Sequence, residues 1–145
     1  EYFMKQALKM AQQAYDEDEV PIGAVLVWNN KIIAKGHNNS QRLNDCTAHA
    51  EMIALTSGFN AAGSPYLNEC ALYVTVEPCS MCAGALKWSQ LGKLVYGAAE
   101  QKAGYTLYKP LLLHKKTEVV SSILKEECAE LMTRFFKKKR EHKEL

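Results

Sequence analysis

Apolar residues at the start of the chain recur at helical spacing, which predicts a first helix. These residues are Phe3, Ala7, Met10 and Ala14. The helix is expected to end in the acidic run 16–19, because Pro21 follows and a helix does not readily continue through proline. Two apolar, β-branched stretches, 22–28 and 31–36, then flank Asn29-Asn30. Asparagine tolerates a positive φ, so this pattern predicts a tight β-hairpin.

The rest of the chain alternates helical and strand-like segments. Helices are expected over about 47–59, over 80–88 and from 124 onward, and strands over 71–76, 93–98 and 118–121. The segment 101–113 contains Gly104 and Pro110, which indicate an irregular or broken helix. An opening hairpin followed by alternating helices and strands favours an α/β fold. We expect a three-layer sandwich in which a mixed β-sheet carries helices on both faces.

Length and composition fit one globular domain spanning residues 1–145. Of these residues 48% are apolar and 23% are charged, which excludes a fibrous or disordered chain. Apolar runs stay short, and the run 22–28 is far below the roughly 18 residues needed to cross a bilayer. No secretory leader is recognisable at the start. We therefore expect a cytoplasmic protein with no membrane partner.

Five cysteines form an odd set whose spacing does not match a secreted disulfide scaffold. Without an export signal the thiols are expected to stay reduced, which favours metal ligation or redox chemistry. The net charge is only +2, but residues 134–145 hold six cations and two acids. A basic end on a near-neutral body is a mild indication of a polyanion partner. A solvated terminal helix explains the same charges, so composition leaves both readings open.

Two short motifs carry candidate chemistry, each at the start of a predicted helix. His49-Ala50-Glu51 opens one helix and Pro78-Cys79-Ser80-Met81-Cys82 opens the other. One imidazole and two thiolates suit zinc, and the spacing of Cys79 and Cys82 lets both sulfurs reach one ion from a first helical turn. The free N–H groups at that turn favour thiolates. We expect one zinc per subunit, held by His49, Cys79 and Cys82, with the fourth position left to water.

Glu51 lies two residues beyond His49, close enough to accept a proton from that water without binding the metal. Zinc lowers the pKa of such a water to about 7. An H-x-E motif followed by P-C-x-x-C is the known signature of zinc nucleobase deaminases. The sequence therefore predicts hydrolytic deamination with Glu51 as the catalytic acid and base.

Plainer explanations exist for each part of this pattern. A lone C-x-x-C is as typical of redox or structural zinc sites, and a lone histidine is more often a buried core residue. A structural zinc would need a fourth ligand, and the candidates are Cys46, Cys70, His37 and His114. That alternative leaves Glu51 without a role.

The chain closely resembles the tRNA-specific adenosine deaminases, bacterial enzymes of the cytidine deaminase-like superfamily that convert adenosine to inosine at the wobble position of tRNA anticodons. The matching segments are 20–27, 44–45, 47–51, 72–79, 81–85, 126–129 and 135–136. The two zinc motifs are common to the superfamily, whereas a closing helix with paired phenylalanines and a basic run resembles the tRNA enzymes. The resemblance implies a five-stranded sheet, a homodimer and the tRNA anticodon arm as a partner.

The resemblance also implies substrate contacts. Asn38 would pair with the purine edge, Ala50 would offer its backbone N–H, and Ile22 and Val76 would form the pocket wall. Asn38 is equally typical of a turn, and Ile22 and Val76 of a plain strand core. Possible RNA contacts are Phe136, Lys137, Lys138, Lys139 and Arg140. Phe135 lies on the apolar stripe of its helix and is expected in the core.

Three departures from the family pattern concern the substrate. Cys46 stands where proline is usual, His37 stands where tryptophan is common, and the segment 101–114 lacks the small-residue run of the family. A free nucleobase or nucleoside deaminase, acting on guanine, cytosine or cytidine with the same zinc site, is therefore an alternative. A zinc-containing RNA-binding module without activity is a second.

Overall fold

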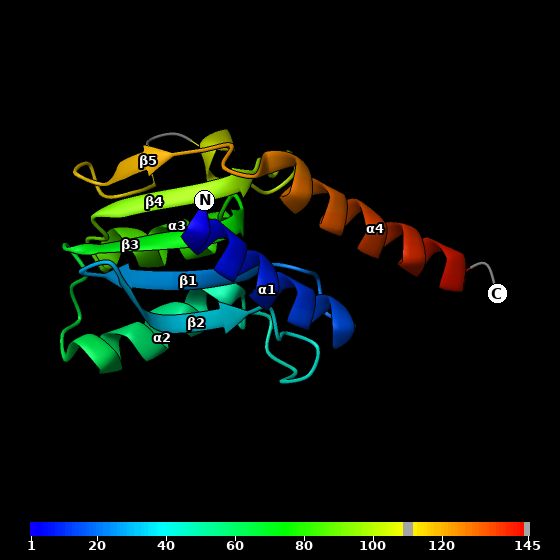
Figure 1. Ribbon diagram of the computed structural model, residues 1–145, viewed down its shortest axis with the longest axis horizontal. Coiled ribbons are helices and arrows are strands. Elements are labelled where there is room, and N and C mark those ends of the chain that lie inside the picture. The colour runs from blue at the N-terminus through cyan, green and yellow to red at the C-terminus, as the bar shows by residue number, and fades with distance from the viewer. Residues whose placement is uncertain (109–111, 144–145) are drawn as a thin grey trace.

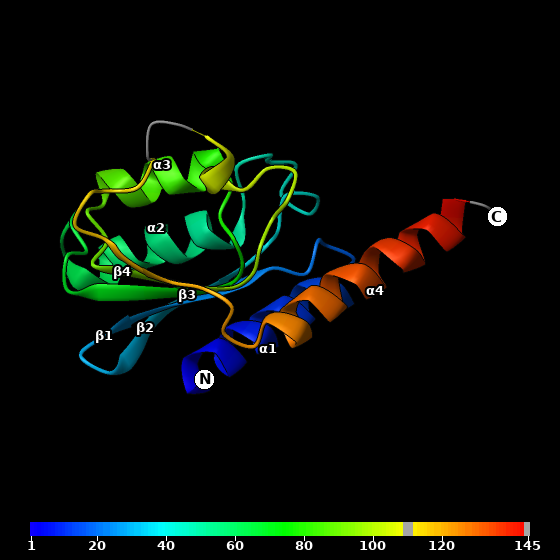
Figure 2. The ribbon, with the colours of Figure 1, turned by 90° about the horizontal axis from the view of Figure 1, so that it is seen from above.

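A five-stranded mixed β-sheet separates the helices into two layers (Figures 1 and 2). The computed structural model describes residues 1–108 and 112–143. Its elements in chain order are α1 (Tyr2–Asp16), β1 (Gly23–Trp28), β2 (Lys31–His37), α2 (Ala50–Ala62), β3 (Cys70–Val76), α3 (Ser80–Trp88), β4 (Lys93–Ala98), the 3₁₀ turn η1 (Tyr105–Leu107), β5 (Glu118–Val120) and α4 (Lys125–Lys143). The strands lie in the order β2-β1-β3-β4-β5. This arrangement confirms the predicted fold class.

The opening hairpin makes the sheet mixed. Strand β1 pairs antiparallel with both β2 and β3, whereas β3, β4 and β5 are mutually parallel along the sheet. Asn29 and Asn30 have φ angles of 51° and 62°, and they connect Trp28 to its partner Lys31. Two left-handed residues match the right-handed twist of the flanking strands, so the asparagine pair forms the predicted turn.

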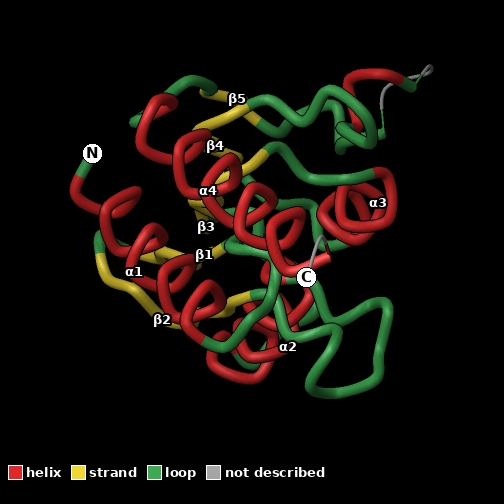
Figure 3. The backbone as a smooth tube through the Cα atoms, turned by 90° about the vertical axis from the view of Figure 1, so that its right-hand side faces the viewer, coloured by secondary structure: helices red, strands yellow, loops and turns green. Residues whose placement is uncertain are grey.

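Each face of the sheet is covered by two helices. Helices α1 and α4 lie on one face and α2 and α3 on the other, with the sheet between them (Figures 2 and 3). The first layer closes over a core that includes Met4, Ala7 and Val25, and the second over a core that includes Leu26 and Leu72. Adjacent residues of β1 thus pack into opposite cores, because successive side chains of a strand point to opposite faces of the sheet.

Helix α2 begins at Ala50, later than the predicted start at Thr47. The cause is a local turn: the Asp45 Oδ1 accepts hydrogen bonds from the Thr47 N–H (2.9 Å) and the Thr47 hydroxyl (2.6 Å). Such side-chain bonds compete with the first helical turn. At its other end α2 continues to Ala62 and closes on Gly63 with a φ of 63°.

In its described part, residues 101–108 and 112–113, the segment after β4 is irregular, as expected, and contains the short turn η1. Pro110 lies outside the described residues. Helix α4 starts over the sheet, and its last turns extend past the ends of the strands (Figures 1 and 2). No helix within residues 1–108 and 112–143 is both long and apolar enough to span a membrane.

Gly36 places the end of β2 directly against the start of α2. A Cβ at this position would lie 2.3 Å from the Ala50 carbonyl oxygen and 2.8 Å from the Ala54 nitrogen. We expect Gly36→Ala to lower the free energy of unfolding by about 1–3 kcal/mol, because the helix must move away from the strand. Urea denaturation measures this change. The control is Lys35→Ala, an exposed neighbour, and equal losses in both variants would contradict this close packing.

Candidate active site

The first turns of α2 and α3 converge on one face of the sheet, and each is preceded by a candidate ligand. His49 is the N-cap residue of α2 and Cys79 is the N-cap residue of α3. Both have extended backbone, with φ and ψ of −75° and 154° for His49 and −73° and 174° for Cys79. Cys82 follows in the first turn of α3 and is fully buried. The positive ends of two helices therefore face the same three side chains.

The three candidate ligand atoms form a compact group. His49 Nδ1 lies 3.6 Å from Cys79 Sγ and 3.6 Å from Cys82 Sγ. Zn–N and Zn–S bonds of about 2.1 and 2.3 Å at a tetrahedral angle separate nitrogen and sulfur by about 3.6 Å. The spacing of the side chains therefore fits a tetrahedral zinc ion, and the donor set of one imidazole and two sulfurs fits its chemical preference.

The pKa values of the two thiols shift in opposite directions. The pKa of Cys79 falls to about 4, because its thiolate accepts a hydrogen bond from Cys82 and another from His49. The same hydrogen bond to Cys79 and burial raise the pKa of Cys82. The bond to Cys79 also raises the pKa of His49. The cluster thus holds thiolate charge at neutral pH, and a dication at this position would displace the remaining thiol proton.

Glu51 lies beside the cluster in the first turn of α2 and is only 3% exposed. Burial raises its pKa from 4.5 to about 7, and the nearby charge of Cys79 acts in the same direction. A carboxyl group with such a pKa can both accept and return a proton near neutral pH. The environment of Glu51 is therefore that of a proton carrier.

The fourth ligand that a structural zinc would need is absent from the described residues. His49, Cys79 and Cys82 are the one group of three or more potential ligands that they contain. Of the four candidates, Cys46 is exposed, Cys70 is buried at the start of β3, and His37 Nε2 lies 3.0 Å from Glu17 Oε2. His114 likewise does not join the cluster. The geometry therefore favours an open coordination position.

The predicted substrate residues lie at strand ends and at the start of α2. Asn38 is buried just after β2; its backbone N–H donates to the Ile22 carbonyl (3.0 Å), and its Oδ1 accepts from the Ser40 hydroxyl (3.3 Å). Ala50 is buried between His49 and Glu51. The tight contact of Gly36 with Ala50 brings the Asn38 segment next to the start of α2. Val76 ends β3, three residues before Cys79.

Some basic side chains of α4 already have partners within the protein. Lys139 forms an ion pair with Asp18 (2.7 Å), and Lys138 lies over the Tyr15 ring at 5.2 Å. Phe135 is buried, as expected, whereas Phe136 is 43% exposed. A groove of about 700 Å³ runs between α4 and the end of β4; its lining includes Val76, Lys102, Met132, Phe136 and Arg140. Of the two residues of the predicted pocket wall, Val76 therefore lines the same groove as the basic helix α4.

Sequence reasoning missed two buried carboxylates that hold loops near the site. Glu19 accepts hydrogen bonds from the N–H groups of Gln41 (3.0 Å) and Arg42 (2.8 Å), which anchors the loop after Asn38. Glu77 binds the segment after β4 in the same manner. The available signal was an acidic residue close to a strand end and to a proline: Glu77 directly follows β3 and precedes Pro78, and Glu19 lies two residues before Pro21 and four before β1.

Comparison with known proteins places this site in a family. A family profile described as the cytidine and deoxycytidylate deaminase zinc-binding region matches residues 1–98. The tRNA-specific adenosine deaminase of Bacillus subtilis is 42% identical over 99% of this chain and 92% of its own length. That of Aquifex aeolicus is 41% identical over 97% of this chain and 95% of its own length. The chain belongs to the tRNA-specific adenosine deaminase family.

Solved structures agree with membership of this deaminase family. One, from work on A-to-I editing by tRNA:A34 deaminases at the wobble position, has a TM-score of 0.84 and 40% identity and covers 90% of this chain and 98% of its own. A guanine deaminase from Bacillus subtilis has a TM-score of 0.65 and 38% identity, covering 68% of this chain and 63% of its own. Both confirm the deaminase fold, and the first extends over more of the chain.

Zinc content should depend on the three clustered side chains alone. We expect the purified deaminase to contain about one zinc per chain and the His49→Ala and Cys82→Ser variants to lose at least about tenfold in zinc affinity, because two ligands do not hold the ion. Elemental analysis after dialysis against a competing chelator measures this. Cys46→Ser is the matched control and should keep its zinc; loss of zinc in that variant would show that the coordination is not the one described.

Proposed function

We propose that this protein hydrolyses adenosine to inosine at the wobble position of tRNA anticodons. Water replaces the exocyclic amino group of the adenine, and ammonia leaves. The observation that carries this proposal is a buried carboxylate, Glu51, in the first turn of α2 beside a cluster of three candidate zinc ligands. The likeness to tRNA-specific adenosine deaminases over almost the whole chain supports the choice of substrate.

His49, Cys79 and Cys82 would hold one zinc ion per chain. A zinc ion there supplies a water that is a nucleophile at neutral pH. Glu51 would accept one proton of the attacking water on a carboxylate oxygen and pass it to a ring nitrogen of the adenine. It would then carry the second proton of that water to the amino group, which leaves as ammonia. Its burial keeps bulk water from competing for that proton.

The base pocket would be formed by Asn38, Ala50, Ile22 and Val76. The Oδ1 of Asn38 already accepts a bond from Ser40, and its amide N–H groups are the donors that could meet the purine edge. Ala50 contributes its backbone N–H in the first turn of α2, where helical N–H groups lack internal partners. Ile22 and Val76 lie at the ends of the central strands and would pack against the ring.

RNA rather than a free base is supported by the surface next to this pocket. Phe136 offers an exposed ring for base stacking, and Lys137, Lys138 and Arg140 offer charge for phosphates. Lys139 is the weaker candidate, because Asp18 already neutralises it. A guanine deaminase shares the fold over about two thirds of this chain, so a free nucleobase is the alternative substrate.

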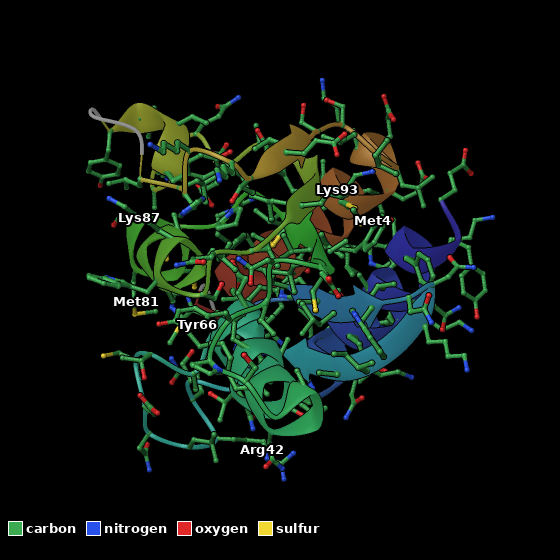
Figure 4. All side chains as sticks on the ribbon, turned by 90° about the vertical axis from the view of Figure 1, so that its left-hand side faces the viewer. Met4, Arg42, Tyr66, Met81, Lys87 and Lys93 are labelled. Carbon is green, nitrogen blue, oxygen red and sulfur yellow. The ribbon has the colours of Figure 1, made fainter. Side chains whose placement is uncertain are left out.

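We also propose that the protein is a single deaminase domain over residues 1–145, that it acts in the cytoplasm, where its tRNA substrate would be, and that it forms a homodimer. Support for the dimer comes from the outer face of α3. Met81, Gly84, Ala85 and Trp88 follow one another at helical spacing on this face, and Trp88 is 82% exposed. Met81 and the neighbouring Lys87 project away from the sheet (Figure 4). An apolar stripe with so exposed a tryptophan is typical of an interface.

Replacing Glu51 tests the mechanism. We expect Glu51→Gln to lower kcat by about 10²–10⁴-fold, because the amide cannot carry the proton, while zinc content and folding stay intact. The assay measures inosine and ammonia formed from an adenosine-34 anticodon stem-loop, with free guanine, cytosine and cytidine tested in parallel. Glu69→Gln, at an exposed position, is the matched control. Turnover unchanged in Glu51→Gln contradicts the mechanism, and release of ammonia from free bases alone contradicts the RNA substrate.

Replacing Trp88 tests the dimer. We expect Trp88→Lys to shift the protein from twice the monomer mass toward the monomer, since a charge cannot be buried unpaired between two apolar faces. Light scattering during gel filtration measures the mass. Trp28→Lys replaces another exposed tryptophan at the end of β1 and should leave the mass unchanged. A wild-type protein that elutes as a monomer at micromolar concentration would disprove the proposed interface.

A further inference from the structure

Glu77 is a buried carboxylate for which the proposed reaction has no use. It stands between Val76, the last residue of β3, and Pro78, which precedes the candidate ligand Cys79. Only 5% of its surface is exposed. Within residues 1–108 and 112–143 it forms no ion pair with a lysine, arginine or histidine. A buried acidic side chain without a cation needs hydrogen-bond donors, and their identity indicates its role.

Among the described residues, the donors to the Glu77 side chain come from one segment, residues 99–108, called here the 99–108 loop. Its Oε1 accepts from the Glu100 N–H (3.2 Å), and its Oε2 accepts from the Thr106 N–H (3.1 Å) and the Thr106 hydroxyl (2.8 Å). These donors belong to residues 23 and 29 positions away in the chain. The carboxylate therefore joins both ends of the loop to the turn that follows β3.

Gly104 shows how close the loop lies to this carboxylate. A Cβ on Gly104 would lie 2.2 Å from Glu77 Oε2 and 2.5 Å from the Glu100 carbonyl oxygen, so no larger residue fits without a shift. Gly104 also forms a β-bridge with Cys79, and the Tyr105 N–H donates to the Pro78 carbonyl (2.9 Å). The loop is thus attached to the backbone of the candidate zinc ligand itself.

We propose that Glu77 is a positioning residue that sets the shape of the RNA groove by fixing the 99–108 loop. The groove between this loop and α4 is lined by Ala99, Glu100 and Lys102 on one side and by Phe136 and Arg140 on the other. The hydrogen bonds of the Glu77 carboxylate given above go to the loop and not to the candidate ligands, so its influence passes through the loop. This inference rests on the proposed function, because it assumes that RNA occupies the groove.

Glu77→Gln is the sharpest test. It keeps the volume of the side chain but removes its charge and replaces one acceptor oxygen by an amide donor. We expect Glu77→Gln to keep its zinc, to speed amide hydrogen exchange at Glu100 and Thr106 by about tenfold, and to raise KM for an adenosine-34 anticodon stem-loop by about tenfold with kcat within about twofold. Exchange of the β1 amides serves as the internal reference. Glu118→Gln, an exposed glutamate on β5, should change neither quantity.

Two further variants act on the same contact from the loop side. Thr106→Val removes only the hydroxyl bond and should give a smaller change of the same kind. Gly104→Ala pushes a methyl group against the carboxylate and should reproduce the effect of Glu77→Gln. If Glu77→Gln does not fold, the amide exchange and the KM of these two variants test the proposal in its place.

Unchanged exchange in the loop would overturn the anchoring role. Faster exchange with an unchanged KM would overturn the link to the RNA groove and leave Glu77 as a stabilising residue only. Failure of the proposed function has a different signature: the wild-type enzyme would leave the stem-loop unmodified, while the exchange of the loop amides would still respond to Glu77→Gln.

Discussion

The candidate active site depends on the approach of two helix N-termini on one face of the sheet. Helix α2 can reach its position because Gly36 on β2 leaves room for the Ala50 carbonyl, and α3 starts directly after β3. His49 and Cys79 are the N-cap residues of these helices, so both side chains leave the backbone at the positive ends of two dipoles. The spacing of 3.6 Å between His49 Nδ1 and each thiol sulfur follows from this packing.

Three buried glutamates around this centre have different roles because their surroundings differ. Glu51 faces the thiols, and burial raises its pKa to about 7, which suits proton transfer. Glu19 and Glu77 instead accept backbone N–H groups and fix two separate loops, the one after Asn38 and the 99–108 loop. The candidate ligands and Glu51 thus lie at helix starts, whereas the segments of the proposed substrate surface are held by hydrogen bonds to carboxylates. The family profile ends at residue 98, before the 99–108 loop and α4 begin.

The sequence predicted the elements whose signals are local. Asn29-Asn30 marked the hairpin, and the spacing of Cys79 and Cys82 marked the metal cluster, because each pattern acts within a few residues. The late start of α2 was missed, since the Asp45 side chain forms a turn that periodicity does not register. Lys139 could not be recognised as paired, because Asp18 lies 121 residues away in the chain. The roles of Glu19 and Glu77 likewise depend on backbone groups distant in sequence.

A zinc ion held by His49, Cys79 and Cys82 has one coordination position left open for the reaction. X-ray absorption spectroscopy of the zinc-loaded protein tests this most directly, since sulfur and lighter ligands differ in bond length. For this coordination we expect two sulfurs at about 2.3 Å and two nitrogen or oxygen ligands at about 2.0 Å, with one of the lighter ligands replaced when a transition-state analogue of adenosine hydration binds. Three or more sulfurs, or a shell that does not change with the analogue, would contradict it.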